Sequence, residues 1–507
     1  MGKEEGQSEG GALYAQPRFW HGLFVVAIIL NVYAIFISDL GLDKHVEGAY
    51  VETEDGWVLD WGDTRTEDPL ASNPDDAKVF SEHIVNTEMI MPLAILGMIL
   101  AILVTTKLGL NRMTVTVLML NPALIFSIGR GYSEYTYLGI LAIGWMAWNQ
   151  FKNSKGQRFL PRMAAIAIAS MLILSIWSLK LKVDLMELMF PFLALLFLGW
   201  VIDRIPIEWL NPQKALIGGF GIGMGFVVLA GILGYGSFSV VTSETSRFIQ
   251  ALPISVFGVL IVYGFVGMVL WPFARQTWQG MADSTDRLAG ELSLFIGAMS
   301  GLIVAYVACL WTYESVMWDS AWPWHMWTMG NNGRYITILA IPCYLLIQRV
   351  NGDLDWRQPT AVFGVLMILP ISMAAGIHGQ TYWTDDAAEL LSEQMGEDED
   401  FLFVHDSILG MHYLYTFHTH IEDVSERNIT GHWRAPNSDW ENELFEEQQI
   451  ERRGNLSSVK WVVLAPGIEW AEPPEGWQFE TGDVDFMNGG GEWEVWYPSE
   501  NLTNSET

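Results

Sequence analysis

About eleven runs of predominantly apolar residues follow one another between residues 19 and 375. The hydrocarbon core of a bilayer is about 30 Å thick and needs about 20 such residues in a helix. We expect spans at Phe19–Ser38, Met89–Thr106, Met113–Ile128, Tyr135–Asn149, Met163–Trp177, Leu185–Ile202, Ala215–Leu233, Leu252–Phe273, Leu292–Trp311, Tyr335–Ile347 and Ala361–Ala375. The sequence therefore predicts a mainly α-helical fold, a polytopic bundle of membrane helices.

The charge of the chain is separated from its apolar runs. The 507 residues are 51% hydrophobic, yet the formal net charge is −31. Acidic residues gather in Asp39–Glu88, which joins the first two predicted spans, and after Asp385. This excess of negative charge argues against a nucleic-acid partner. We expect a transmembrane domain at 19–375 with its first long loop at 39–88, followed by a C-terminal domain at 376–507.

The C-terminal domain is predicted to be a small α+β domain, with short strands at Val459–Leu464 and Trp493–Tyr497. Lys and Arg are more frequent in alternate short loops, as in Lys152–Arg162. Because basic residues favour the cytoplasmic side, residues 1–18 are expected in the cytoplasm. An odd number of spans then places the C-terminal domain outside the cell membrane.

Carboxylates follow the first predicted span directly. Asp39 and Asp43 are four residues apart, so they share one face if the helix continues for a turn. A partly buried carboxylate there can take a proton from a hydroxyl, and His45 and Glu47 follow it closely. The alternative is a solvated acidic loop that only ends the helix.

The same loop contains a tight segment, Asp60–Arg65, that includes Asp63 and Arg65. Its glycine favours a turn, and Trp61 can stack on a sugar ring. A surface turn explains the segment equally well.

Two further segments combine glycines with one arginine at the start of a predicted helix. The first is Gly129–Glu134, which contains Arg130 and Tyr132, and the second is Gly330–Tyr335, which contains Arg334. Free N–H groups at a helix start and a guanidinium both bind phosphate. The alternatives are an ion pair between Arg130 and Glu134 for the first segment and an interfacial aromatic belt for the second.

Common catalytic and metal motifs are absent from the sequence. There is no phosphate-binding loop and no zinc-protease motif. His412, His418 and His420 lie close together, but the sequence around them has no cysteine and no suitably spaced acid. We interpret these histidines as packed or surface residues.

The sequence resembles the GT-C superfamily of polytopic glycosyltransferases. The resemblance rests on the acidic motif after the first span, the long first loop, the segment Gly129–Glu134 with Asn121-Pro122 before it, and the terminal domain. This superfamily includes protein O-mannosyltransferases, dolichol-phosphate-mannose-dependent mannosyltransferases and lipid A aminoarabinose transferases. The resemblance implies an inverting hexosyltransferase-like transfer of a sugar from a polyprenyl (dolichyl) phosphate to a protein, lipid or glycan acceptor at the outer face of the membrane.

The resemblance also implies roles for particular residues. The base is Asp43 first and Asp39 second, although the family's common Asp-Glu pair is Asp43-Lys44 here. The donor phosphate is expected to bind Arg130, Tyr132 and Arg334. The acceptor, or another part of the substrate, is expected to contact His45, Glu47, Asp63, Arg65 and Glu134. No cofactor and no obligatory metal are expected, because the first loop lacks the Asp-x-Asp motif of the oligosaccharyl branch.

Two other functions compete with sugar transfer. A transporter or flippase of a lipid-linked or anionic substrate is disfavoured, because the sequence has no convincing internal repeat and little charge within the spans. A non-catalytic membrane scaffold accounts for the terminal domain but leaves the two glycine-arginine segments unexplained.

Overall fold

The computed structural model divides into two compact units. The helical unit contains the described residues of 1–36, 93–129 and 133–377, and the sheet unit those of 37–92, 130–132 and 378–507. The structure describes residues 13–39, 50–53, 56–59, 90–152, 204, 206, 211–234, 236–317, 330–377, 382–396, 399–405, 410–423, 427, 429, 431–434, 436, 438–445, 456, 459–484 and 491–499.

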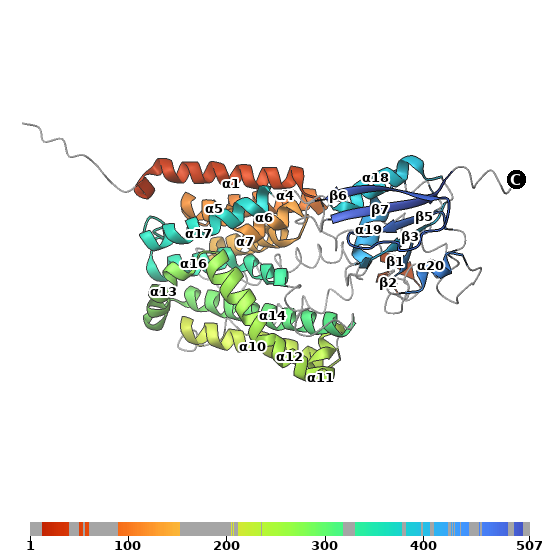
Figure 1. The fold of residues 1–507 in the computed structure, drawn as a ribbon. Helices are drawn as coiled ribbons and strands as arrows, with labels where there is room; N and C mark the ends of the chain where they lie inside the picture. The colour runs from red at the N-terminus through yellow and green to blue at the C-terminus, as the bar shows by residue number, and fades with distance from the viewer. Residues whose placement is uncertain are drawn as a thin grey trace, which may run out of the picture. The chain divides into compact units, whose positions relative to one another are not determined.

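Helices make up the described part of the helical unit (Figure 1). In chain order they are η1 (Leu13–Ala15), α1 (Pro17–Ile37), α4 (Ile90–Lys107), α5 (Arg112–Met119), α6 (Pro122–Gly129), α7 (Glu134–Lys152), α10 (Pro212–Ile232), η4 (Gly236–Ser239), α11 (Val240–Ser243), α12 (Thr245–Ser255), η5 (Val256–Gly267), α13 (Trp271–Asp283), α14 (Arg287–Met317), η6 (Gly330–Leu339), α16 (Ala340–Asn351) and α17 (Pro359–Ile377).

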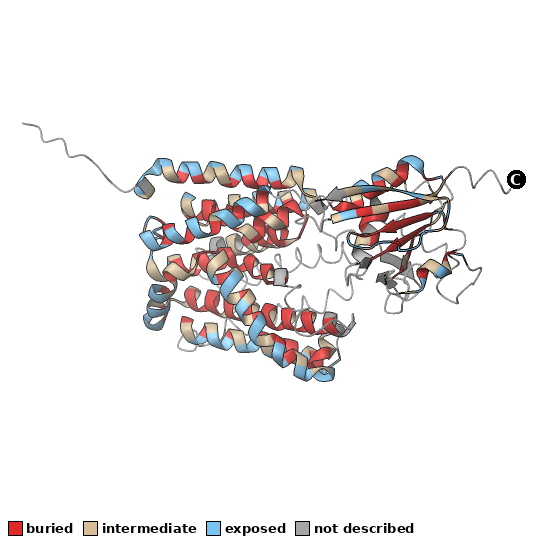
Figure 2. Cartoon of the chain, viewed as in Figure 1, coloured by how far each residue is buried: buried red, intermediate tan, exposed pale blue. Residues whose placement is uncertain are grey.

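Five of the described helices are long and apolar enough to cross a membrane. They are α1, α10, α12 continued by η5, the first 26 residues of α14, and α17. Their outward faces carry large exposed apolar side chains, as at Ile222 and Phe226 of α10 (Figure 2). Such faces are stable in lipid but unfavourable in water. The chain is therefore a multi-pass membrane protein, as predicted, although the expected spans Met163–Trp177 and Leu185–Ile202 lie outside the described residues.

Three expected spans differ from the helices observed. Met113–Ile128 is a broken span, in which α5 and α6 meet at 57° because Asn121 Oδ1 accepts the Ala123 N–H at 2.9 Å and Pro122 starts a new helix. In the expected span Leu252–Phe273, the helix ends at Gly267, and a turn leads from there into α13. Tyr335–Ile347 begins inside the 3₁₀ helix η6 and continues in α16.

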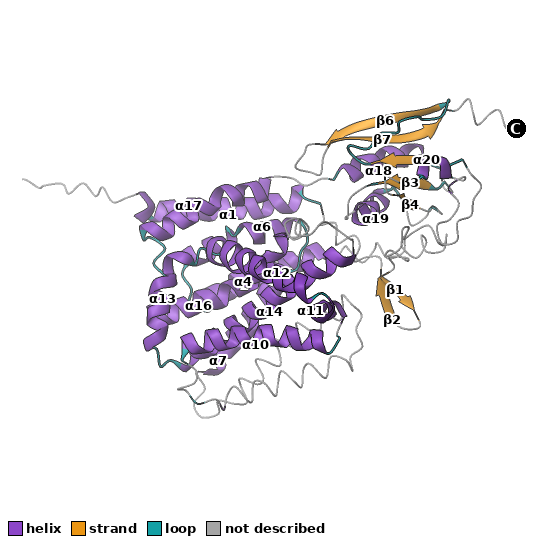
Figure 3. Ribbon diagram, turned by 60° about the horizontal axis from the view of Figure 1, so that its bottom comes forward, coloured by secondary structure: helices purple, strands orange, loops and turns teal. Residues whose placement is uncertain are grey.

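Glycines allow α10 and α14 to lie side by side at very short distance (Figure 3). A Cβ placed on Gly223 would lie 1.9 Å from the Ala298 carbonyl oxygen, and one on Gly297 would lie 2.1 Å from that of Leu216. Small residues have this role in membrane bundles because close backbone packing replaces the hydrophobic effect as the attraction between helices.

The sheet unit is built around a five-stranded sheet in the order β4-β3-β5-β7-β6. Its strands are β3 (Phe401–Val404), β4 (Gly431–Arg434), β5 (Trp461–Leu464), β6 (Trp477–Val484) and β7 (Gly491–Pro498). β3 is parallel to β4 and β5, whereas β7 is antiparallel to β5 and β6. The strands expected at Val459–Leu464 and Trp493–Tyr497 fall on β5 and β7, so the prediction of a small α+β domain is confirmed. A separate hairpin pairs β1 (Tyr50–Thr53) with β2 (Gly56–Leu59).

Helices cover both faces of this sheet, as central parallel strands require. Trp383 of α18 (Trp383–Gln394) stacks on Phe403 at 5.4 Å, and Phe417 of α19 (Gly410–His420) packs on the same ring at 5.5 Å. On the opposite face, Trp440 of α20 (Trp440–Glu443) belongs to a core that includes Leu402 and Val404. Side chains along β3 therefore point alternately to the two faces of the sheet, and Phe403 holds α18 and α19 on one of them.

Candidate active site

The residues predicted for the site fall into three groups. Asp39, Arg130 and Tyr132 belong to the sheet unit, whereas Glu134 and Arg334 belong to the helical unit. The remaining candidates lie outside the described residues: Asp43, His45, Glu47, Asp63 and Arg65. Each unit therefore contains its own polar cluster.

Arg130 is a buried cation in the sheet unit, only 5% exposed. Its Nη1 donates to the Asp39 carbonyl oxygen at 3.4 Å and to the Tyr382 hydroxyl, and the guanidinium lies 4.5 Å from the centre of the Tyr382 ring. Burial lowers the pKa of Arg130, while Tyr382, Tyr132 and Asp39 raise it. A guanidinium keeps its charge in such a site. Among the described residues, nothing pairs with the Arg130 Nε.

Asp39 lies two residues after the end of α1 and is hydrogen-bonded to Asp385 of α18. The second oxygen of Asp385 accepts the Tyr382 backbone N–H at 2.9 Å, which caps α18 and holds the carboxylate in place. Burial raises the pKa of Asp385 well above its usual range, and the hydrogen bond and the charge of Asp39 raise it further. Two carboxylates this close favour sharing one proton or one cation, because both cannot stay charged alone.

His420, the last residue of α19, completes this group. Its Nδ1 lies 3.2 Å from Asp385 Oδ1 and 2.8 Å from the Thr416 carbonyl oxygen. A cavity of about 500 Å³ opens here, lined by Asp39, Asp385, Asp386, Glu389, Ser392, Glu393, His420 and Glu422. The cavity is therefore strongly acidic, with one imidazole among its carboxylates.

The helical unit contains a buried ion pair between Glu134, the first residue of α7, and Arg334 of η6. Arg334 Nε donates to Glu134 Oε1 at 2.8 Å, and both side chains are about 5% exposed or less. The guanidinium also lies 5.1 Å from the centre of the Tyr335 ring. Glu134 thus has Arg334 as its partner, 200 residues away, a contact that was not predicted.

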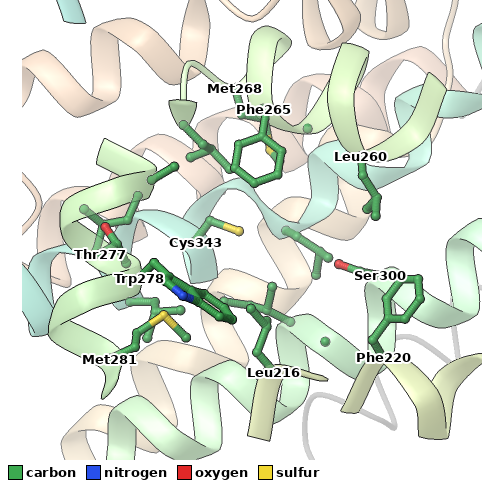
Figure 4. A pocket seen from close by; sticks show the side chains of 18 of the residues that line it. Leu216, Phe220, Leu260, Phe265, Met268, Thr277, Trp278, Met281, Ser300 and Cys343 are labelled. Atoms are coloured by element: carbon green, nitrogen blue, oxygen red, sulfur yellow. The ribbon is translucent and has the colours of Figure 1, made fainter. Parts of the chain in front are cut away.

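A large apolar cavity of about 890 Å³ lies in the same unit (Figure 4). Side chains such as Phe220, Leu260 and Trp278 line it, and Ile336 and Leu339 of η6 add to the wall. The helix that carries Arg334 therefore also borders this cavity. Its size and apolar lining suit a hydrocarbon chain.

Asp385, Tyr382 and the role of His420 were not predicted from the sequence. The prediction that no acid accompanies the histidines was wrong, because Asp385 reaches His420 from 35 residues upstream. One signal was available: Asp385 and Asp386 open a helix soon after the last apolar run, as Asp39 follows the first.

Comparison with known proteins gives a single kind of match. No family model matches the chain, and no curated protein does. Two solved structures of ArnT from Cupriavidus metallidurans are similar to it, each with a TM-score of 0.41. The one bound to undecaprenyl phosphate is 13% identical and covers 95% of this chain and 98% of its own. The apo structure is 14% identical, with 94% and 98% covered. ArnT is a polytopic membrane glycosyltransferase of the GT-C group, which the sequence resembles.

Proposed function

We propose that this protein is a membrane glycosyltransferase that moves a sugar from a polyprenyl phosphate to a hydroxyl acceptor at the outer face of the membrane. The observation that carries the proposal is the contact between Arg130 and Asp39. The residue expected to bind the donor phosphate donates a hydrogen bond to the backbone carbonyl of Asp39, an expected base, although 91 positions separate them. Sugar transfer needs a cation that binds the leaving phosphate and a carboxylate that deprotonates the acceptor, and Arg130 lies beside the acidic segment that begins at Asp39.

The chemistry needs orientation, a base and positive charge at the leaving group. A carboxylate takes the proton of the acceptor hydroxyl, whose oxygen attacks the anomeric carbon from the face opposite the phosphate. The bond from that carbon to the phosphate oxygen breaks, so polyprenyl phosphate leaves and the configuration inverts. The buried guanidinium of Arg130 stabilises the negative charge that develops on the phosphate. The base is Asp43 first and Asp39 second.

The helical unit supports a lipid-linked donor in its own way. A polyprenyl phosphate carries a long hydrocarbon chain, and the cavity of about 890 Å³ is lined almost entirely by apolar side chains. Because η6 carries both Arg334 and part of the cavity wall, the arginine of the buried Glu134–Arg334 pair stands on the helix that borders an apolar space. This combination matches the two parts of such a donor.

Transfer by the purified full-length protein in nanodiscs tests the proposal. A panel of polyprenyl-phosphate sugars is offered with membrane extract as acceptor, and the release of polyprenyl phosphate is measured. We expect Arg130→Ala to lower the rate by roughly 10²-fold or more, because it removes a preorganised charge from the leaving group. Lys460→Ala is the matched control, since Lys460 is an exposed cation of the same unit.

Asp43→Asn should abolish transfer while leaving the protein folded and inserted. Full transfer in both Asp43→Asn and Asp39→Asn would show that the base is elsewhere. If no donor in the panel releases polyprenyl phosphate in nanodiscs, but lipid-linked sugar crosses the membrane of vesicles that contain the reconstituted protein, the protein is a transporter instead.

A further inference from the structure

We propose that Asp39, Asp385 and His420 bind one divalent metal cation of the zinc or manganese kind. The inference goes beyond sugar transfer and does not depend on it. The three residues come from separate parts of the sheet unit: the segment after α1, the first turn of α18 and the end of α19. Two carboxylates and one imidazole are a common mixed ligand set for these metals.

The spacing of the three side chains suits coordination. One ligand atom from each residue lies within 4.8 Å of the other two. In a tetrahedral site, ligand atoms about 2.1 Å from the ion are about 3.4 Å apart, so side-chain movements of about an ångström or less bring the three atoms to coordination distance. Asp385 Oδ1 and His420 Nδ1, at 3.2 Å, already have the separation of adjacent ligands.

A neighbouring group holds one of the ligands, Asp385, in position. The helix cap fixes Asp385 through the Tyr382 N–H, which donates to Oδ2 at 2.9 Å, while Oδ1 faces His420. Such secondary contacts orient metal ligands and strengthen binding. His420 Nδ1 exchanges its 2.8 Å contact with the Thr416 carbonyl for the ion. The site is thus partly preorganised by α18.

The cavity around these residues attracts positive charge and has room for water. Six carboxylates and one imidazole line its volume of about 500 Å³, and no lysine or arginine is among the lining residues that the structure describes. A cation there offsets the mutual repulsion of Asp39 and Asp385, and water fills its remaining coordination positions. The competing explanation is a proton shared between the two aspartates, which needs no role for His420.

A bound metal has one consequence for the reaction proposed above. A carboxylate that ligates a metal is a poor base, so Asp39 becomes a metal ligand and the base is Asp43. The metal also ties the segment after α1 to α18 and α19 within the sheet unit.

Zinc binding to the full-length protein in detergent tests the inference without any sugar donor. After treatment with EDTA and its removal, Zn²⁺ is titrated against a chelating dye, and bound metal is counted after dialysis. Co²⁺ is then used as a spectroscopic probe of the ligand set. We expect one Zn²⁺ per chain, with Kd raised at least about tenfold in Asp385→Asn and in His420→Gln.

Asp386→Asn is the matched control, because it removes one charge from the same cavity without removing a ligand. We expect it to weaken binding by no more than about threefold, the effect of one solvated charge nearby. All variants should melt, in EDTA, at the temperature of the wild type in EDTA.

Three results would overturn the metal site. They are the absence of saturable Zn²⁺ binding, an equal loss of affinity in Asp386→Asn and His420→Gln, and an unchanged Co²⁺ spectrum in His420→Gln. The outcomes for the two proposals are separable. Zinc binding with no transfer from any donor refutes only the glycosyltransferase, and transfer without zinc binding refutes only the metal site.

Discussion

Acid should weaken the sheet unit through His432, which lies on β4 beside β3. Its side chain is 5% exposed, and among the described residues neither ring nitrogen has a hydrogen-bond partner. Burial lowers the pKa of His432 from 6.5 to about 4, since a charged imidazole is poorly solvated there. The proton therefore binds the unfolded chain more tightly than the folded one.

The size of the effect follows from linkage between protonation and folding. A group with a depressed folded-state pKa contributes its full stability above the unfolded pKa and loses it as the pH falls below that value. At pH 5 the imidazole is protonated in the unfolded chain, where its pKa is 6.5, but almost unprotonated in the folded protein, where its pKa is about 4. Proton binding therefore stabilises the unfolded chain and lowers the free energy of unfolding by about 2 kcal/mol. His432 alone should thus cost the sheet unit about 2 kcal/mol between pH 8 and pH 5.

Pulse proteolysis of the full-length protein in urea measures this loss. Cleavage within residues 401–484 is followed by mass spectrometry at pH 8, 7, 6 and 5, for the wild type and for His432→Phe. The apolar ring has no proton to bind, so the variant should lose about 2 kcal/mol less than the wild type over this range. Equal pH dependence in both proteins would refute the reasoning.

Three further predictions concern the helical unit. Arg334→Ala should destabilise the protein by about 3–5 kcal/mol, seen as a lower melting temperature in detergent, because it leaves the Glu134 carboxylate buried and unpaired. Gly223→Ala should prevent a monodisperse preparation in size-exclusion chromatography, because its Cβ would lie 1.9 Å from a carbonyl of α14. Leu260→Trp should fill part of the apolar cavity and raise KM for long-chain donors but not for short-chain ones, measured by transfer assays.

Each of these predictions has a control or a contrary outcome. Replacing both members of the ion pair, as in Glu134→Leu with Arg334→Met, should restore much of the stability, and an equally unstable double variant would contradict the account. Gly221→Ala should leave chromatography unchanged, because nothing lies within 4 Å of its Cβ position. Phe257→Trp, on the exposed face of η5, should leave KM unchanged, and an equal rise there would argue against the cavity.

Local patterns in the sequence were enough for most of the described secondary structure. An apolar run of about 20 residues determines a membrane helix by its own length and composition, which is why α1, α10 and α17 lie where they were expected. The short strands β5 and β7 were likewise predicted from β-branched and aromatic residues. The break in the third span was visible as Asn121-Pro122, but its angle of 57° depends on the packing of α6.

The candidate sites, in contrast, were decided by tertiary structure. Asp39 was predicted to share a helix face with Asp43, and only folding brings it to Asp385 and His420 from the far end of the chain. Glu134 was expected to bind substrate, with an ion pair to its neighbour Arg130 as the alternative, yet its carboxylate binds Arg334, 200 residues away. Hydropathy is a property of a short segment and can be read along the chain. Contacts between charged side chains depend on distances in space, because their energy falls with separation and with exposure to water.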